Sequence, residues 1–284
     1  MTSGNKPLDG GNLVLSTEEK EQLLRSHPTC DGFIRKFIGS SDYINGNERW
    51  CLWLNDDNLH EAIKIHEIKE RIEKVKQFRL EGGNNAKAKA LTPHKFEFSN
   101  EPKQSQIIVP RVSSIRREYI PMGFVEIDNV IADSSQVIYD AEPYVFGLLN
   151  SKMHMIWVRV TAGRLKSDYR YSSYFSYHTF PFPNISTQRK NEITQAVFRI
   201  LEEREKHSDK TLAELYDPNK MPNGLREAHH QNDIIIEKCY RSTPFKSDEE
   251  RLEYLFKLYE KMIGEEKERE AKEKAAKKTR NKKK

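Results

Sequence analysis

The stretch QSQIIVPRV, residues 104–112, lies where the character of the chain changes. It is short, rich in β-branched residues and interrupted by a proline, a pattern typical of a β-strand. Three similar segments accompany it, each bounded by Pro, Ser, Asp or Asn: HKFEFSN at 94–100, REYIPMGFVEI at 117–127 and SQVIYD at 135–140. From about residue 93 we therefore predict a β-rich region, which decides the fold class.

The segment before this region mixes helix and hairpin signals. Ser16 and Glu19 have the spacing of a capping box and predict a helix over TEEKEQLLRSH. Residues 33–54 hold the turn pair Asn45-Gly46 between two apolar and aromatic runs, which predicts a β-hairpin.

Apolar residues at helical spacing then predict one helix over residues 56–80, and residues 84–92 are expected to form a mobile loop.

The second half of the chain reads as mostly helical. Residues 143–163 predict one helix, with Pro143 in its first turn and Gly163 just past its end. Pro181 and Pro183 mark a boundary, and the segments beyond it are helical: 186–208, 209–216, 222–241 and 247–263. The expected fold class is α+β. We predict a mixed, β-rich domain over 1–183, a helical domain over 184–263 and a charged, disordered tail over 264–284.

Composition narrows the class of protein. Hydrophobic residues make up 36% of the 284 residues and mean hydropathy is −0.82, so no run approaches the ~20 apolar residues of a membrane span. Residues 1–13 lack the apolar core of a secretory signal. Cys30, Cys51 and Cys239 are widely spaced and form neither a disulfide framework nor a metal-binding pair. These features predict a cytoplasmic protein that does not contact membranes.

The net charge of +5 comes from the end of the chain. Six of the last eight residues, KKTRNKKK, are basic, and without them the chain is close to neutral. Such a tail is usually a solvated end and only sometimes an arm that binds nucleic acid. A case for nucleic-acid binding must therefore rest on local patches elsewhere.

Motifs for catalysis are missing. The sequence contains no G-x-G-x-x-G, Walker, G-x-S-x-G or H-E-x-x-H motif, and no Asn-Pro-Pro-aromatic tetrad of amino-methyltransferases. In a helix, His60 and His66 would lie on different faces, and the adjacent His229 and His230 would diverge. We therefore predict no catalytic residue and no metal site in this chain.

Two local patches combine cations with hydroxyls and aromatics, the groups that hold phosphates and fix register on DNA. Many surface strands share this composition, so the pattern is weak alone. The candidate contacts to DNA backbone or bases are Arg111, Ser113, Ser114, Arg116, Arg117, Lys152, Arg159, Arg164, Tyr169, Tyr171 and Ser172.

The stretch GRLKSDYRYS, residues 163–172, is the most informative part of these patches. In an extended chain, Lys166, Asp168 and Arg170 would share one face, with Arg164 beside them. Lysine can donate to O6 and N7 of guanine while aspartate accepts from N4 of cytosine, so Lys166 and Asp168 could read one G·C pair. An ordinary surface ion pair explains the same spacing, and spacing alone favours it.

Longer motifs resemble a known family. They are GGNLVLS at 10–16, FIGSSDYINGNERWCLWL at 37–54, VPRVSSIRREYIPMGF at 109–124, YVFGLLNSKMHMIWVRVTAGRLKSDYRYS at 144–172, YHTFPFP at 177–183 and LAELYDPNKMPNGLREAHHQNDIIIEKCY at 212–240. In this order they resemble the target recognition domain and helical C-terminal domain of MmeI-like single-chain type II restriction–modification enzymes and their methyltransferase-only relatives. The similarity extends to about residue 263.

The resemblance implies a DNA-reading module. The family's specificity positions fall on Lys166, Asp168 and Arg170, and the lysine–aspartate pair would read a G·C pair. Arg170 would act together with an earlier loop, here Asp133, Ser134 and Ser135. The resemblance also implies that a methyltransferase domain of the same parent chain is a partner, beside double-stranded DNA.

Cofactors follow from the same resemblance. The parent would use S-adenosylmethionine, and Mg²⁺ if it also cleaves DNA, whereas this chain is expected to bind neither. Two alternatives stay open from the sequence. One is a protein-interaction module that uses the charged helix 57–80 and the tail. The other is a specificity subunit of a multi-subunit restriction system, although such subunits usually carry two recognition domains.

Overall fold

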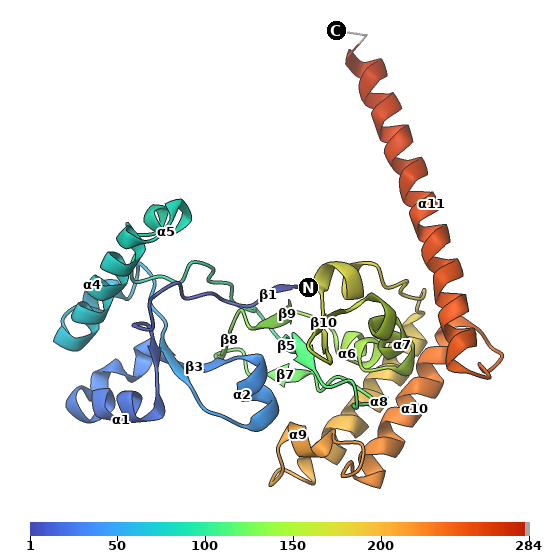
Figure 1. The fold of residues 1–284 in the computed structure, drawn as a ribbon, viewed down its shortest axis with the longest axis horizontal. Coiled ribbons are helices and arrows are strands. Elements are labelled where there is room, and N and C mark those ends of the chain that lie inside the picture. Colours follow the sequence, from blue (N-terminus) through green and yellow to red (C-terminus); the bar gives the residue numbers. More distant parts are fainter. Residues whose placement is uncertain (282–284) are drawn as a thin grey trace. The chain divides into compact units, whose positions relative to one another are not determined.

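The computed structural model describes residues 1–281, and the side chains of residues 1–274. The chain folds into two compact units, and each is made of two stretches of sequence (Figure 1). Unit 1 comprises residues 1–142 and 206–221, and unit 2 begins at Pro143, runs to Glu205 and resumes at Pro222. The predicted α+β fold class is confirmed, because strands concentrate in unit 1 and long helices in unit 2.

Unit 1 contains two four-stranded sheets. The first is antiparallel, in the order β1 (Thr2–Ser3), β9 (Ser135–Tyr139), β5 (Gln106–Pro110) and β7 (Gly123–Val125). The second has the order β2 (Val14–Leu15), β4 (Trp50–Leu52), β3 (Ile34–Ile38) and β8 (Val130–Ile131), and only the β3–β8 pair is parallel. The strand β6 (Val112–Ser113) follows β5 directly. Three of the four predicted β-rich segments thus become strands, whereas residues 94–100 contribute a single bridge at Phe98.

Helices cover these sheets. Their bounds are α1 (Thr17–Ser26), the 3₁₀ helix η1 (Pro28–Phe33), α2 (Ser40–Asn45), α3 (Leu59–Ala62), α4 (His66–Glu81), α5 (Asn84–Ala88) and α9 (Leu212–Leu215). The predicted capping box of α1 is confirmed: Ser16 Oγ accepts from Glu19 N at 3.2 Å, and Glu19 Oε2 accepts from Ser16 N at 2.8 Å. Leu23 of α1 and Ile68 of α4 enter the core cluster that also contains Cys51 and Leu52 of β4.

Three local predictions for unit 1 were wrong in detail. The strands β3 and β4 pair as an antiparallel hairpin, but α2 connects them, and Gly46 ends that helix at a φ of 72° instead of forming a two-residue turn. The expected helix 56–80 is interrupted, because Ile65 adopts an extended conformation between α3 and α4. Residues 84–92 begin with α5, which replaces the expected loop.

Unit 2 is built from helices and one hairpin. Its elements are α6 (Pro143–Leu149), α7 (Lys152–Thr161), β10 (Gly163–Leu165), β11 (Asp168–Arg170), the π-helix η2 (Ser173–His178), α8 (Thr187–Glu205), α10 (Asn223–Tyr240) and α11 (Asp248–Asn281). Gly147 lets α6 approach its neighbours closely, since a Cβ there would lie 2.5 Å from Cγ2 of Ile193 and 2.9 Å from Oδ1 of Asn232. The amide of Asn232 in turn donates to the Gly147 carbonyl at 2.9 Å.

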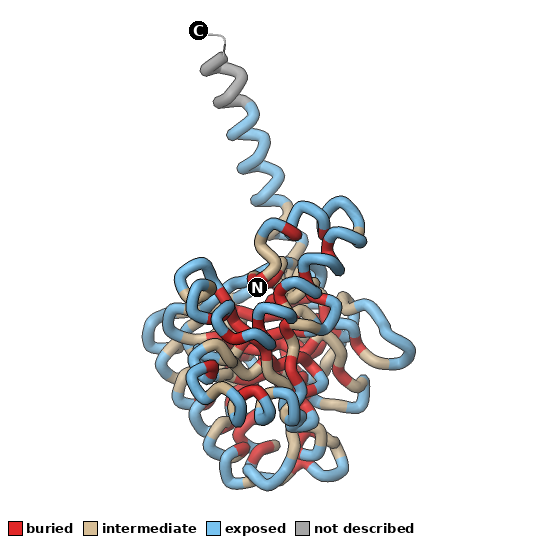
Figure 2. Tube along the Cα trace, turned by 90° about the vertical axis from the view of Figure 1, so that its left-hand side faces the viewer, coloured by how far each residue is buried: buried red, intermediate tan, exposed pale blue. Residues whose placement is uncertain are grey.

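Two predictions for unit 2 also need correction. Residues 143–163 form two helices, because Ser151 leaves the helical conformation and caps α7 by accepting from His154 N at 3.2 Å. The last helix continues to Asn281 instead of ending near residue 263, and its outer part is exposed (Figure 2). The disorder expected for 264–284 stays a prediction, and residues 282–284 lie outside the described chain. Within the described residues, no helix is long and apolar enough to cross a membrane.

Candidate nucleic-acid interface

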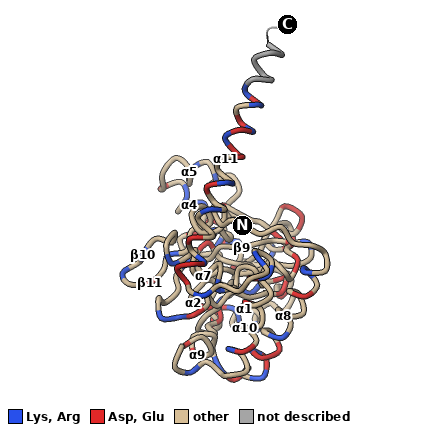
Figure 3. Tube along the Cα trace, turned by 90° about the vertical axis from the view of Figure 1, so that its right-hand side faces the viewer, with Lys and Arg blue, Asp and Glu red and all other residues tan. Residues whose placement is uncertain are grey.

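The stretch GRLKSDYRYS is a hairpin, and the prediction of one extended row of charges was wrong. Strand β10 pairs with β11 so that Gly163 faces Arg170, Arg164 faces Tyr169 and Leu165 faces Asp168. Lys166 and Ser167 form the two-residue turn. Figure 3 places this hairpin beside α7 and colours its cations blue.

The hairpin redistributes the charges between its two faces. Directly paired residues share a face, so Asp168 and Arg170 lie on one face and Arg164 on the other. There the guanidinium of Arg164 stacks 4.3 Å from the ring centre of Tyr169. Lys166 occupies the tip with a φ of 55°, as at the first central position of a type II′ turn, where glycine is usual.

The three hairpin side chains that were predicted to read bases differ in how exposed they are. Lys166 and Arg170 are exposed and Asp168 is half-buried. Within the described part of the chain, the side chains of Lys166, Asp168 and Arg170 form no hydrogen bond or ion pair. The predicted Lys166–Asp168 surface ion pair is therefore absent among these residues, and both groups can bind a ligand.

By contrast, the two predicted cations of α7 are engaged. Lys152 Nζ lies 3.0 Å and Arg159 Nη1 3.1 Å from the carboxylate of Asp248 at the start of α11. Burial alone would favour the neutral acid, but the hydrogen bond from Lys152 and the charges of Lys152 and Arg159 lower the pKa of Asp248 below its usual value. These cations hold α11 against α7, which weakens their case as DNA contacts.

The basic patch of unit 1 is partly used by the fold. Arg111 donates through Nη2 to Ser3 Oγ at 2.7 Å and through its backbone N to Ser40 Oγ at 3.0 Å. Arg117 donates to the buried Ser113 Oγ at 3.4 Å. Ser114 accepts from the backbone N of Arg116 at 3.3 Å, and the Arg116 side chain is exposed to solvent.

The predicted partner loop of Arg170 is anchored on α2. Ser40 Oγ donates to the Ser134 carbonyl at 2.6 Å and lies 3.0 Å from Ser135 Oγ, which is fully buried. Asp133 is half-buried and Ser134 is exposed, so these two remain candidates for base contacts. Ser135 serves the fold instead. Sequence reasoning missed Ser40, because nothing in the local sequence signals a contact across more than ninety positions.

Three other predicted contacts also serve the fold. The ring of Tyr169 is buried. Tyr171 OH lies 2.9 Å from Nε2 of the buried His154, and burial raises the pKa of Tyr171 well above its usual value. Ser172 Oγ accepts from the backbone N of Phe175 at 3.2 Å and so caps η2. Tyr171 and His154 together fix the end of the hairpin to α7.

The structure adds two residues that sequence reasoning did not single out. Tyr174 and Phe175, on η2 just after the hairpin, are 67% and 57% exposed. The aromatic run YFSYHTF at 174–180 could have drawn attention to them, but aromatic runs usually belong to a core.

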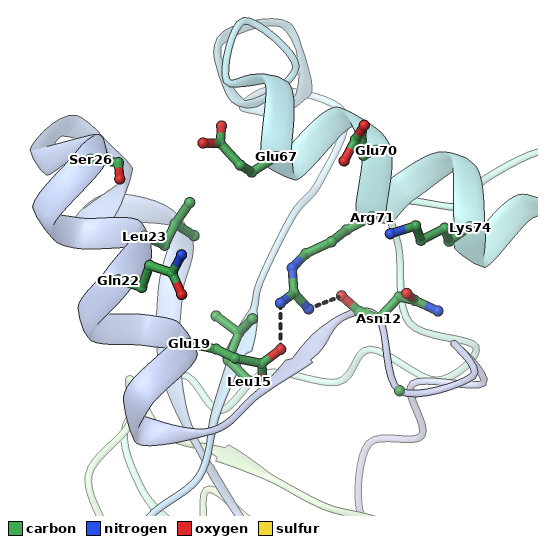
Figure 4. Close-up of a pocket in the computed structure, with 11 residues that line it drawn as sticks. Asn12, Leu15, Glu19, Gln22, Leu23, Ser26, Glu67, Glu70, Arg71 and Lys74 are labelled. Atoms are coloured by element: carbon green, nitrogen blue, oxygen red, sulfur yellow. Dashed lines mark hydrogen bonds and ion pairs between the residues drawn. The ribbon is translucent and has the colours of Figure 1, made fainter.

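A cavity in unit 1 does not favour small-molecule chemistry. It measures about 410 Å³ and lies between α1 and α4 in unit 1 (Figure 4). Its central cation is already satisfied, since Arg71 donates to Glu19 at 2.6 Å and to the Asn12 carbonyl at 3.1 Å. Glu67 in turn lies 3.0 Å from His27. Across the described residues, no group of three or more His, Cys, Asp and Glu side chains is placed to hold a metal ion.

Comparisons with known proteins bear on this interface. Residues 1–184 match the model of the MmeI target recognition domain, and residues 185–267 match that of the MmeI C-terminal domain. DNA methyltransferase A of Bacillus subtilis (strain 168) is 48% identical over 261 residues, which cover 91% of this chain and 30% of that protein. A solved structure of the Type IIL restriction-modification enzyme MmeI in complex with DNA superposes with a TM-score of 0.88 at 36% identity, over 93% of this chain and 35% of that one. The chain thus spans about a third of the length of these relatives.

Proposed function

The chain belongs to the MmeI family, of which it carries the target recognition and C-terminal domains, and from this premise we propose that it reads a short sequence in double-stranded DNA for an adenine-N6 methyltransferase. The observation that carries the proposal is the β10–β11 hairpin, whose end presents Lys166, Asp168 and Arg170 without side-chain partners among the described residues. Most cations nearby, such as Lys152 and Arg159, are held in ion pairs.

The chemistry of this hairpin suits base reading in the major groove. A two-stranded ribbon fits the width of that groove. Lys166 would donate to O6 and N7 of guanine, and Asp168 would accept from the N4 amino group of the paired cytosine. A carboxylate among cations has little use in binding phosphates, which it repels, but it can accept from the N4 amino group of cytosine, a donor that guanine and thymine lack in the major groove. One such pair contributes roughly 1–3 kcal/mol of discrimination.

Arg170 extends the same surface. We assign it a second base contact, keep Asp133 and Ser134 of unit 1 as candidates for further base contacts, and assign phosphate contacts to the exposed Arg116 and Arg164. Methylation itself would belong to a domain of the parent protein outside this chain, and S-adenosylmethionine would bind there. A cytoplasmic location fits the free thiols of Cys30, Cys51 and Cys239.

The proposal is tested by exchanging the charges of Lys166 and Asp168. The chain is incubated with a randomised library of DNA duplexes, and bound sequences are selected and read for wild type and for the double variant Lys166→Glu, Asp168→Arg. Glutamate accepts from cytosine and arginine donates to guanine, so one position of the selected motif should change from G to C while the others stay the same.

The control keeps net charge and reverses an ion pair elsewhere. Lys36 and Glu48, 2.7 Å apart on β3 and beside β4, are exchanged as Lys36→Glu, Glu48→Lys, and this variant should select the wild-type motif. Binding by wild type should also weaken steeply between 50 and 200 mM salt, by about a thousandfold or more if six or more phosphates are contacted. An unchanged motif in the Lys166, Asp168 double variant would show that these side chains do not read a base.

A further inference from the structure

Two aromatic side chains that follow the base-reading hairpin in the sequence are exposed to solvent. Tyr174 and Phe175 are 67% and 57% exposed, and their ring centres lie 5.0 Å apart in a T-shaped arrangement. Single exposed apolar side chains are common, but an adjacent pair of large rings forms an apolar patch that is typical of interaction sites.

The backbone beneath the rings is fixed, so they are not the tips of a mobile loop. Ser172 caps the π-helix by accepting from Phe175 N, and the Phe175 carbonyl accepts from Thr179 Oγ1. Thr179 Oγ1 also accepts from Nε1 of the buried Trp157 at 3.1 Å, which ties η2 to α7. Short π-helical segments are rare and are frequently found at functional sites. The rings are therefore presented from a rigid base.

The cations near the two rings indicate which kind of ligand binds there. Tyr174 follows Arg170 by four residues, a stretch that spans at most about 14 Å when fully extended. Arg170 thus lies within about 14 Å of Tyr174 along the chain, and the exposed cations Arg164 and Lys166 belong to the same hairpin, with Asp168 as its carboxylate. Aromatic side chains beside a cationic surface are the combination that proteins use to stack unpaired nucleobases while neutralising phosphates.

We propose that Tyr174 and Phe175 form a stacking platform for a nucleobase that has lost its stacking neighbour in the DNA duplex. This inference rests on the proposed function. An enzyme that modifies a DNA base must take that base out of the stack, which exposes the face of an adjacent base. The platform covers that face, and the hairpin beside it keeps the distorted site in register.

Duplexes with one missing base provide the probe. Starting from the sequence selected by wild type, a series of duplexes is made in which a single abasic site occupies each position in turn. Binding of the chain to each duplex is measured by fluorescence anisotropy. Wild type should bind at least one abasic duplex about tenfold more tightly than the intact duplex, because the gap removes the cost of unstacking.

The variants Tyr174→Ala and Phe175→Ala should each reduce this preference at least severalfold, and should bind the intact duplex within about twofold of wild type. Phe198→Ala is the matched control, because Phe198 is 43% exposed on α8 of the same unit and lies away from the hairpin in sequence. This control should keep the full preference.

Each other outcome overturns the platform. Equal binding of wild type to intact and abasic duplexes excludes it. A preference that survives in Tyr174→Ala and Phe175→Ala shows that the rings serve another purpose, such as docking against another protein domain. An equal loss in Phe198→Ala shows a general effect on unit 2. Failure of wild type to bind any duplex would instead refute the proposed function, before the aromatic variants are compared.

Discussion

The guanidinium of Arg79 on α4 joins separate segments of unit 1 and offers the sharpest test of its stability. The side chain is fully buried. Its five N–H donors reach five backbone carbonyl oxygens at 2.7–2.9 Å, those of Pro7, Leu8, Lys89, Thr92 and Lys95. Because an arginine side chain has five donors in total, every one is used.

Two substitutions separate charge from geometry. Lysine at position 79 keeps the charge but offers three donors from one point, so at least two of the five carbonyls lose their partner. At about 1–1.5 kcal/mol for each bond, Arg79→Lys should lower the free energy of unfolding by about 2–3 kcal/mol. Arg79→Met keeps the apolar stem and leaves all five carbonyls without this donor. Relief from burying a charge offsets part of that loss, so about 4 kcal/mol is expected.

Urea unfolding followed by tryptophan fluorescence measures both values. In a Trp157→Phe background, only Trp50 and Trp53 report, and both belong to the core of unit 1. Arg25→Met on α1 is the control, since Arg25 is 71% exposed beside Glu21, and it should change stability by less than about 0.5 kcal/mol. If Arg79→Met unfolds at the same urea concentration as the control, the buried bonds do not contribute as argued. If Arg79→Lys has the same free energy of unfolding as the protein with Arg79, the planar arrangement of the five guanidinium donors does not contribute to stability.

Three further predictions concern unit 2. Lys166→Gly should raise the free energy of unfolding by about 1 kcal/mol, because glycine tolerates the φ of 55°, yet it should lose the G preference in DNA selection. Gly147→Ala should lower it by about 1–3 kcal/mol through the clash with Ile193, measured by urea unfolding. Burial lowers the pKa of His154 to about 3, against about 6.5 when unfolded, so the unfolded chain binds more protons between these values. The contribution of His154 to the free energy of unfolding should therefore be largest above pH ~6.5 and should fall as the pH decreases, by up to about 1.4 kcal/mol per pH unit. The variant His154→Phe should lose this contribution to the pH dependence of unfolding between pH 7.5 and 5.

Local patterns predicted the elements whose causes are local. The capping box of Ser16 and Glu19 is a contact between residues three positions apart, and the β-branched run at β5 needs only its own sequence to favour a strand. Pattern reasoning failed where a single residue changes the backbone conformation inside a segment whose overall pattern continues. Ser151 interrupts a continuous apolar run, and Lys166 turns the chain at a position where glycine or asparagine would have signalled a hairpin.

The sequence predicted candidate residues by their chemical type, but it could not predict which of them are already paired inside the fold. The sequence pointed equally to Lys152, Arg159 and Lys166 as cations. Only the structure reveals that the carboxylate of Asp248, about ninety positions away, pairs with the first two, whereas Lys166 has no ion-pair partner among the described residues. In the same way, Tyr171 and Tyr174 look alike in sequence, yet one donates or accepts inside the core and the other faces solvent. Long-range partners decide which side chains remain for a ligand.

Several features that cost free energy lie in one short segment. Lys166 adopts a left-handed conformation that is unfavourable for a lysine, Asp168 has no partner among the described residues to offset its half-burial, and Tyr174 and Phe175 expose their rings. By contrast, two other charged groups find partners within the fold: Arg79 donates to five carbonyls, and Asp248 pairs with two cations from α7. Local conflicts of this kind persist where function requires them. Since a bound duplex would supply acceptors for Lys166, a donor for Asp168 and a stacking face for the rings, one ligand would resolve all of these costs together.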